Sequence, residues 1–336
     1  MILNLQYVRA FAAIIVVMFH ITVNDPGGIA GSAVYTFFNN WGAAGVDLFF
    51  VLSGFIMVYV QDRAHRGARD FLTERVIRIV PLYWFVTLGW CAILLVGSAQ
   101  FRSIYFDPMQ VLASLGFVSH PAGYTFPFIV PGWTLEYEAL FYLIFAASLL
   151  AFRERYFLPL LVAVALASLP GATTPILLEF TFGMVAAKIY NHPAIRRAAP
   201  ALFILGATAF VWTAFGETAT VDSNDRGWMR VLYWGLPGLL IITALAGLKQ
   251  VKAPIALFLG NASYSIYLCH PVGIKIYKGV IERVPVIDGL ASTLLCLVLN
   301  IALGCACYVI FEKPVTRALK ARRSNARKTA ILTPPA

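Results

Sequence analysis

Blocks of about twenty apolar residues recur along the whole chain and restrict its fold more than any other feature of the sequence. A helix of that length crosses the ~30 Å hydrocarbon core of a bilayer. Hydrophobic residues make up 60% of the 336 residues and charged residues only 12%, about half of what an ordinary soluble domain carries. The sequence therefore predicts an all-α, polytopic integral membrane protein.

We expect about ten membrane spans. The apolar blocks cover approximately residues 5–23, 43–61, 76–97, 133–151, 157–169, 174–190, 199–215, 230–247, 258–278 and 289–311. Two short blocks, 157–169 and 174–190, are separated by PGATTP and could instead form one kinked helix. The apolar stretch 109–118 is too short to span a bilayer and is interpreted as re-entrant.

Lysine and arginine are distributed unequally between alternate loops. With the N-terminus inside, the inner loops and the C-terminal tail hold eighteen of these residues and the outer loops five. Cytoplasmic loops carry such an excess, so both termini should be cytoplasmic. We expect a transmembrane domain over 1–315 and a disordered basic tail over 316–336. Attraction to anionic lipid accounts for this tail better than nucleic-acid binding does.

The five cysteines all fall within the expected spans, where an oxidising compartment cannot pair them. No CxxC pattern occurs in the chain. We therefore expect neither a disulfide nor a metal site.

The first span, YVRAFAAIIVVMFH, places an arginine and a histidine in an apolar run. Arg9 and His20 are eleven residues apart, three helical turns plus about 20°, so both project from one helix face. His20 then lies roughly 16 Å further from the cytoplasm than Arg9. Ionisable groups within a membrane usually line a functional cavity. The alternatives are snorkelling of Arg9 to the inner interface and a packing role for His20.

Carboxylates enter the outer half of two other spans. Asp47, in GVDLFFVLSGF, should lie near the depth of His20 and could orient its imidazole. The alternative is an aspartate that satisfies the free N–H groups of a helix start. Glu136 and Glu138 open the fourth span, and residues two apart face different sides of a helix. Glu138 is the candidate because it is deeper, whereas Glu136 suits a helix start.

Polar groups on the third and ninth spans complete the set. Arg75 and Arg78, in RVIRIVPLYW, share a helix face at the inner mouth, where two guanidiniums suit phosphate recognition. Positive-inside anchoring is the alternative for each of them. Ser263, Tyr267 and His270, in SYSIYLCHP, form one polar stripe. Hydrogen bonding between helices is the alternative for Ser263 and Tyr267.

Taken together and in their order along the chain, these residues and the motifs around them resemble the membrane-bound acyltransferase-3 family. The resemblance rests on Arg9 with ten residues before His20, on GVDLFFVLSGF, RVIRIVPLYW, WTLEYEALFY and SYSIYLCHP, and on a closing FEKP. It runs from the first span to the last. The opening LNLQYVRAFAAIIVVMFH and WTLEYE resemble most the branch that O-acetylates bacterial exopolysaccharides.

The resemblance implies a multi-pass protein of the bacterial inner membrane that takes an acyl group from cytoplasmic acyl-CoA. The acyl group, commonly acetyl, passes to a carbohydrate hydroxyl at or beyond the outer face; succinyl and other short chains stay open. Membrane lipid and polysaccharide-assembly machinery are the other implied partners, without nucleic acid or metal. Arg75 and Arg78 would bind the CoA phosphates. Glu138 matches the family glutamate, and Thr134 stands where many members have serine.

Several catalytic roles fit these residues. His20 could act as general base on the acceptor hydroxyl, held by Asp47 or Glu138. A buried carboxylate of raised pKa could itself be the base. His20 could also carry the acyl group transiently.

Two other classes of protein are considered. A transporter could use polar residues on several spans as a solute pathway, although no sequence repeat divides the chain into matched halves. A membrane subunit of polysaccharide assembly without catalysis would give Arg9 and His20 no task. Acyl-CoA turnover by the purified protein distinguishes the enzyme from both.

Overall fold

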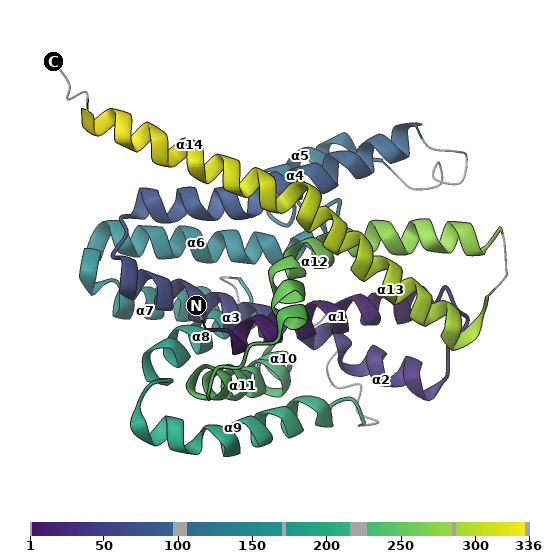
Figure 1. Ribbon diagram of the computed structural model, residues 1–336, viewed down its shortest axis with the longest axis horizontal. Helices are drawn as coiled ribbons and strands as arrows, with labels where there is room; N and C mark the ends of the chain where they lie inside the picture. The colour runs from purple at the N-terminus through teal and green to yellow at the C-terminus, as the bar shows by residue number, and fades with distance from the viewer. Residues whose placement is uncertain (1, 97–105, 170–172, 216–226, 284–286, 333–336) are drawn as a thin grey trace.

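The computed structural model describes residues 2–96, 106–169, 173–215, 227–283 and 287–332. Within these residues the chain is all-helical, as predicted (Figure 1). The main helices are α1 (Asn4–Asn24), α2 (Ala33–Trp41), α3 (Gly45–Ala64), α4 (Ala68–Val96), α5 (Pro108–Leu115), α6 (Gly132–Phe152), α7 (Phe157–Ala167), α8 (Leu178–Ile189), α9 (Pro193–Trp212), α10 (Trp228–Arg230), α11 (Leu236–Gly247), α12 (Pro254–Ile281), α13 (Gly289–Cys307) and α14 (Lys313–Leu332). Two π-helical turns, η5 (Val231–Gly235) and η6 (Tyr308–Glu312), join α10 to α11 and α13 to α14.

Seven helical stretches of the described chain are long and apolar enough to cross a membrane. They are Asn4–Asn24, Ala33–Ala64, Ala68–Leu95, Gly132–Arg155, Pro193–Trp212, Trp228–Gly247 and Gly289–Asn325. Of the ten expected spans, those at α7, α8 and α12 are not among them. Helices α7 and α8 are too short, with 11 and 12 residues. Helix α12 is long enough, with 28 residues, but its composition is not apolar enough. Ten spans therefore stay a prediction, and the multi-pass helical class is confirmed.

Helices α1 and α3 lie at the centre of the bundle. In their most apolar segments 67% and 72% of the residues are buried, against 17% in the segments containing α9 and α13. Helix α1 packs against α3, α12 and α13, and α3 packs against α8 (Figure 1). The polar residues singled out on α1, α3 and α12 are thereby enclosed by other helices and kept away from the lipid.

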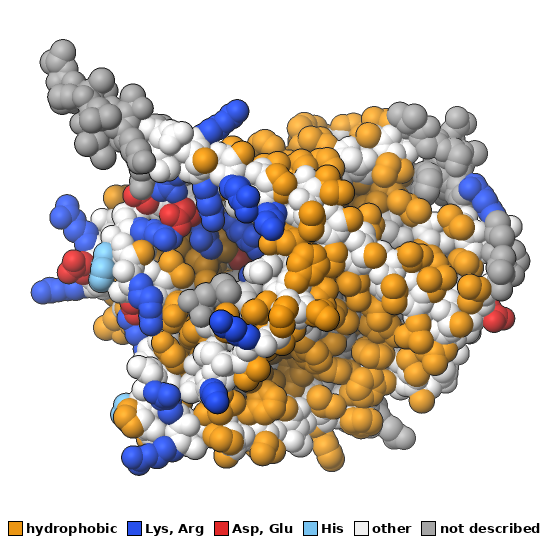
Figure 2. Space-filling model, viewed as in Figure 1, with side chains coloured by type: hydrophobic (Ala, Val, Ile, Leu, Met, Phe, Trp, Pro, Cys, Tyr) orange, Lys and Arg blue, Asp and Glu red, His pale blue; other side chains and the backbone are white. Residues whose placement is uncertain are grey.

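Charged and apolar side chains occupy different parts of the surface. Figure 2 shows lysines and arginines gathered at the left end, where Figure 1 places both termini, and hydrophobic side chains over the rest. This separation fits the predicted excess of basic residues on one side of a membrane. Of the basic residues expected in outer loops, Arg102 and Arg226 lie outside the described residues. Arg230 is not on the surface but fully buried.

The basic C-terminal tail differs from the disordered segment expected over 316–336. Helix α14 continues the polypeptide beyond η6 as a regular helix to Leu332. Arg323 on α14 forms an ion pair with Asp70 on α4, with 2.7 Å between Nη2 and Oδ1. The partner of Arg323 lies 253 residues away in the sequence, so no local pattern could predict this contact.

Helices α3 and α8 cross in direct backbone contact. A Cβ atom on Gly54 would lie 2.0 Å from the Phe180 carbonyl oxygen, and one on Gly183 would lie 1.9 Å from that of Val51. Neither carbonyl belongs to a flexible side chain, so an added methyl group must push the helices apart. Glycines at such crossings let two helices approach closely.

We expect Gly183→Ala to lower the free energy of unfolding by about 1–3 kcal/mol, because overpacked helices must separate. Gly89→Ala is the matched control, since its Cβ would meet no atom within 4 Å. Denaturation of both purified variants in mild detergent checks this. Equal stability of the two variants would contradict the close crossing.

Candidate functional site

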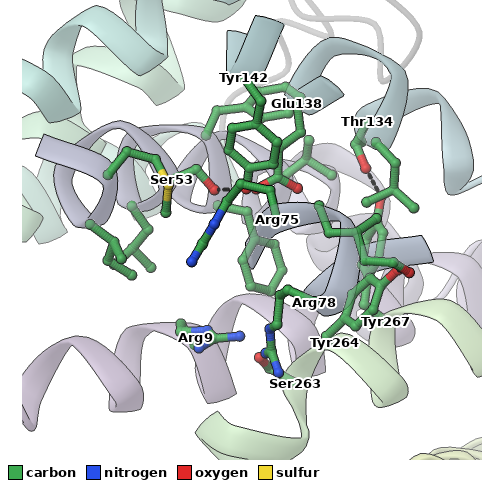
Figure 3. A pocket seen from close by; sticks show the side chains of 18 residues that line it. Arg9, Ser53, Arg75, Arg78, Thr134, Glu138, Tyr142, Ser263, Tyr264 and Tyr267 are labelled. Atoms are coloured by element: carbon green, nitrogen blue, oxygen red, sulfur yellow. Dashed lines mark hydrogen bonds between the residues drawn. The ribbon is translucent and has the colours of Figure 1, made fainter. Parts of the chain in front are cut away.

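A cavity of about 140 Å³ inside the bundle brings together side chains of α1, α3, α4, α6 and α12 (Figure 3). Six residues predicted from the sequence line it: Arg9, Arg75, Arg78, Glu138, Ser263 and Tyr267. Other polar groups of its wall are Ser53, Thr134, Tyr142 and Tyr264. Residues that are scattered over the sequence thus meet in one polar space.

Three arginines give this cavity a cationic side. Arg78 donates to Glu312 over 2.5 Å, between Nη1 and Oε1. The Nε of Arg75 is buried without a hydrogen-bond partner. Arg9 donates from Nη1 to the Gln6 side-chain oxygen over 3.4 Å, which is long for a hydrogen bond. Guanidinium groups with free donors bind oxyanions such as phosphates through paired hydrogen bonds.

Glu138 shares this cavity with the arginines and is held by two hydroxyl groups. The Ser53 hydroxyl donates to its Oε1 over 2.9 Å, and the Tyr142 hydroxyl donates to the same oxygen. Glu136 lies outside the cavity and accepts the backbone N–H of Ser119 over 2.8 Å. Of the two glutamates, only Glu138 therefore presents its carboxylate to the shared space.

His20 and His270 form a separate pair, with ring centroids 4.6 Å apart. The His20 Nδ1 lies 2.9 Å from the Val16 carbonyl oxygen, and the His270 Nδ1 lies 2.6 Å from that of Tyr267. A carbonyl oxygen only accepts, so each Nδ1 carries a proton and each neutral ring has its lone pair on Nε2.

Proline chemistry explains how His270 is held. Pro271 has no N–H to donate to the carbonyl of Tyr267, four residues earlier in α12. The Nδ1 of His270 donates to this carbonyl instead. The Nε2 of His270 is buried and has no hydrogen-bond partner among the described residues. Tyr267 joins the pair to the cavity, because its ring lies 6.0 Å from that of His270 and lines the cavity wall.

Asp47 does not contact His20, contrary to the sequence prediction. Its carboxylate forms a bidentate ion pair with Arg230, with both N–O distances 2.9 Å and both side chains fully buried. The guanidinium also donates to the Ala43 carbonyl over 3.2 Å. Neither Asp47 nor Glu138 orients His20; the backbone carbonyl of Val16 does so instead.

Three buried ionic residues were missed in the sequence: Glu179, Arg230 and Glu312. Glu179 interacts electrostatically with Asp47 and Arg230. Two carboxyl groups and one guanidinium make a neutral cluster only if one carboxyl carries a proton. Glu312 also accepts from Ser265 over 2.6 Å. The sequence could have identified these three residues, because each is a charged residue within or at the end of an apolar block.

The two π-helical turns adjoin these buried charges. Arg230 immediately precedes η5, and Glu312 is the last residue of η6. A π turn inserts one extra residue into a helix and often occurs at a functional site. Thus η5 begins directly after one residue of a buried ion pair, and η6 ends at a residue of another. No sequence pattern predicted this.

A second cavity of about 720 Å³ adjoins the first along α4 and α6. The two share Arg75, Ile79, Leu135 and Tyr142 in their walls. Its other residues are largely apolar, with Glu136 and His120 among the polar exceptions. Within the described residues no group of three or more histidine, cysteine, aspartate or glutamate side chains could hold a metal ion.

Comparison with known proteins places this arrangement in a family. A family model described as an acyltransferase domain matches residues 2–309. The chain belongs to the acyltransferase-3 family. The family predicted from the sequence is confirmed, and this membrane protein is an acyltransferase.

Two known proteins are similar in sequence to this acyltransferase. It is 36% identical over 304 residues to "Exopolysaccharide production protein ExoZ" of Rhizobium meliloti (strain 1021), a match that covers 85% of this chain and 93% of the relative. It is 28% identical over 157 residues to "Putative peptidoglycan O-acetyltransferase YrhL" of Bacillus subtilis (strain 168), covering 42% and 22% of the two chains. No solved structure gives a significant match.

Proposed function

We propose that this acyltransferase moves a short acyl group, typically acetyl, from acyl-CoA to a polysaccharide hydroxyl. The acceptor is a cell-surface or exported polysaccharide or its lipid-linked precursor. Support comes from the relatives, one named for exopolysaccharide production and one for O-acetyl transfer. The bacterial inner membrane is the compartment in which a cytoplasmic donor and an exported acceptor meet.

The observation that carries the proposal is the cavity that gathers three arginines and Glu138, with the histidine pair next to Tyr267 of its wall. Arg75 and Arg78 lie near the start of α4, where Arg66 and Arg75 both approach Glu74. We assign this side of the bundle to the cytoplasm because basic residues are in excess there. Arg75 and Arg78 would bind the CoA phosphates there. The pantetheine arm would then pass Arg9 towards Tyr267, beyond which the histidine pair lies.

His20 is the proposed general base. Its Nε2 takes the proton of the acceptor hydroxyl while the hydroxyl oxygen attacks the thioester carbonyl carbon. The carbon–sulfur bond then breaks, and the CoA thiolate leaves with the proton that the imidazolium returns. Transfer through an acyl group carried on His20 would use the same nitrogen.

Glu138 takes a different role from the one first expected. It is bound to Ser53 and Tyr142 and shares the cavity with the arginines, so it balances part of their charge. We assign it to positioning these side chains around the donor. His270 packs against His20 and would hold the reacting imidazole in place.

Reconstituted transfer tests this function. The purified protein in liposomes should move radiolabelled acetyl groups from acetyl-CoA to de-O-acetylated polysaccharide and release one free thiol for each acetyl transferred. Empty liposomes and a reaction without acceptor are the controls. Movement of a solute without thiol release would contradict the proposal and favour a transporter.

A further inference from the structure

Helix α14 lies beyond residue 309, where the family match ends, yet it packs against α4, the helix that carries Arg75 and Arg78. Figure 1 shows it crossing α4. Arg323 pairs with Asp70 at 2.7 Å and lies 3.6 Å from Glu74, between Nη1 and Oε1. These contacts place the basic face of α14 over the start of α4.

Positive charge is in excess at this contact. Glu74 is shared by three arginines, since Arg66 pairs with it, Arg75 lies 3.9 Å away and Arg323 lies 3.6 Å away. Lys320 precedes Arg323 by three residues and therefore lies on the same face of α14, which packs over the start of α4. It interacts electrostatically with Glu74 and with Arg66, Arg75 and Arg78. Five cations (Arg66, Arg75, Arg78, Lys320 and Arg323) face three carboxylates (Asp70, Glu74 and Glu312), which leaves a surplus of two positive charges.

Two of these cations have donors to spare. None of the ion pairs of the described residues includes Lys320, and the Arg75 Nε is buried without a partner. Like charges held close together repel one another, so such a cluster is stabilised by a bound anion. An ammonium group and a guanidinium fork both suit phosphate oxygens.

We propose that Lys320 of α14 binds the 3′-phosphate at the nucleotide end of acyl-CoA, beside the diphosphate on Arg75 and Arg78. This rests on the proposed function, which threads the pantetheine arm into the cavity and leaves the nucleotide at its mouth. The 3′-phosphate is a monoester with a charge of about −1.5 to −2 at neutral pH, the greatest charge on a single group of the donor. A phospholipid headgroup offers the same phosphate chemistry, so the test must separate the two.

Calorimetric binding to the full-length protein in phosphatidylcholine nanodiscs tests the assignment. We expect the wild type to bind acetyl-CoA roughly tenfold more tightly than 3′-dephospho-acetyl-CoA, since a charge-assisted contact is lost. Lys320→Gln should abolish this difference and leave affinity for the dephospho donor unchanged. The matched control is Arg322→Gln, because residue 322 is exposed and lies about 200° around the helix from residue 320.

Each other outcome overturns a definite part of the argument. Equal binding of both donors by the wild type, or an equal loss of both in Lys320→Gln, overturns the 3′-phosphate contact alone. An effect of Lys320→Gln that occurs only in nanodiscs with added phosphatidylglycerol assigns the lysine to lipid. A wild type that binds neither donor overturns the proposed CoA donor, and this inference with it.

Discussion

Cells that carry His20→Ala should lose O-acetyl groups from their polysaccharide by a factor of roughly 10²–10⁴ while they still make the polymer. The Nδ1 proton of His20 is committed to the Val16 carbonyl over 2.9 Å, so Nε2 is the nitrogen free to take a proton. Alanine removes that nitrogen and leaves the helix intact. The measurement is the O-acetyl content of purified polymer at matched membrane expression of the protein.

His65→Asn is the control for this substitution. His65 is exposed at the end of α3, and asparagine tolerates its left-handed backbone, with φ at 45°. We expect normal acetylation in this variant. Unchanged acetylation in His20→Ala would instead give the residue a packing role. Loss of the polymer itself would indicate export or assembly as the function.

His270→Ala separates the two histidines. As a positioning residue, His270 should affect the rate less than His20 does, and His270→Asn should restore part of the activity by keeping a polar group of similar size. The opposite order, with His270→Ala inactive and His20→Ala active, would exchange their roles.

Arg230→Met should be the most destabilising single substitution outside the cavity, with a loss of about 3–5 kcal/mol in the free energy of unfolding. Methionine keeps most of the length of the side chain but leaves Asp47 buried without its bidentate partner. A buried charge without a counterion costs far more than the pair contributes. Unfolding of the purified protein in mixed detergent measures the difference.

The double variant Asp47→Asn/Arg230→Met should recover part of this loss, because no uncompensated charge then stays in the core. Glu179→Gln is the matched control and should be nearly neutral if Glu179 carries the proton that balances the cluster. A stable Arg230→Met variant would show that water or another group compensates Asp47.

Part of the site was predictable because charges are rare in apolar spans. Six predicted residues line one cavity, and the choice of Glu138 over Glu136 followed from depth and helix geometry alone. The same reasoning, applied to every charge in an apolar block, would have added Glu179 and Glu312. What it could not supply was the partner of each charge, since Arg78 and Glu312 are 234 residues apart.

By itself the sequence determined the class of protein, the approximate length of most spans and the family. These properties depend on local hydrophobicity and on ordered motifs, which are written into consecutive residues. Only the tertiary structure decided that Asp47 pairs with Arg230, that His20 meets His270, and that α14 packs on α4. Helix rotation and crossing fix such pairs, and they follow from packing such as the glycine contact between α3 and α8.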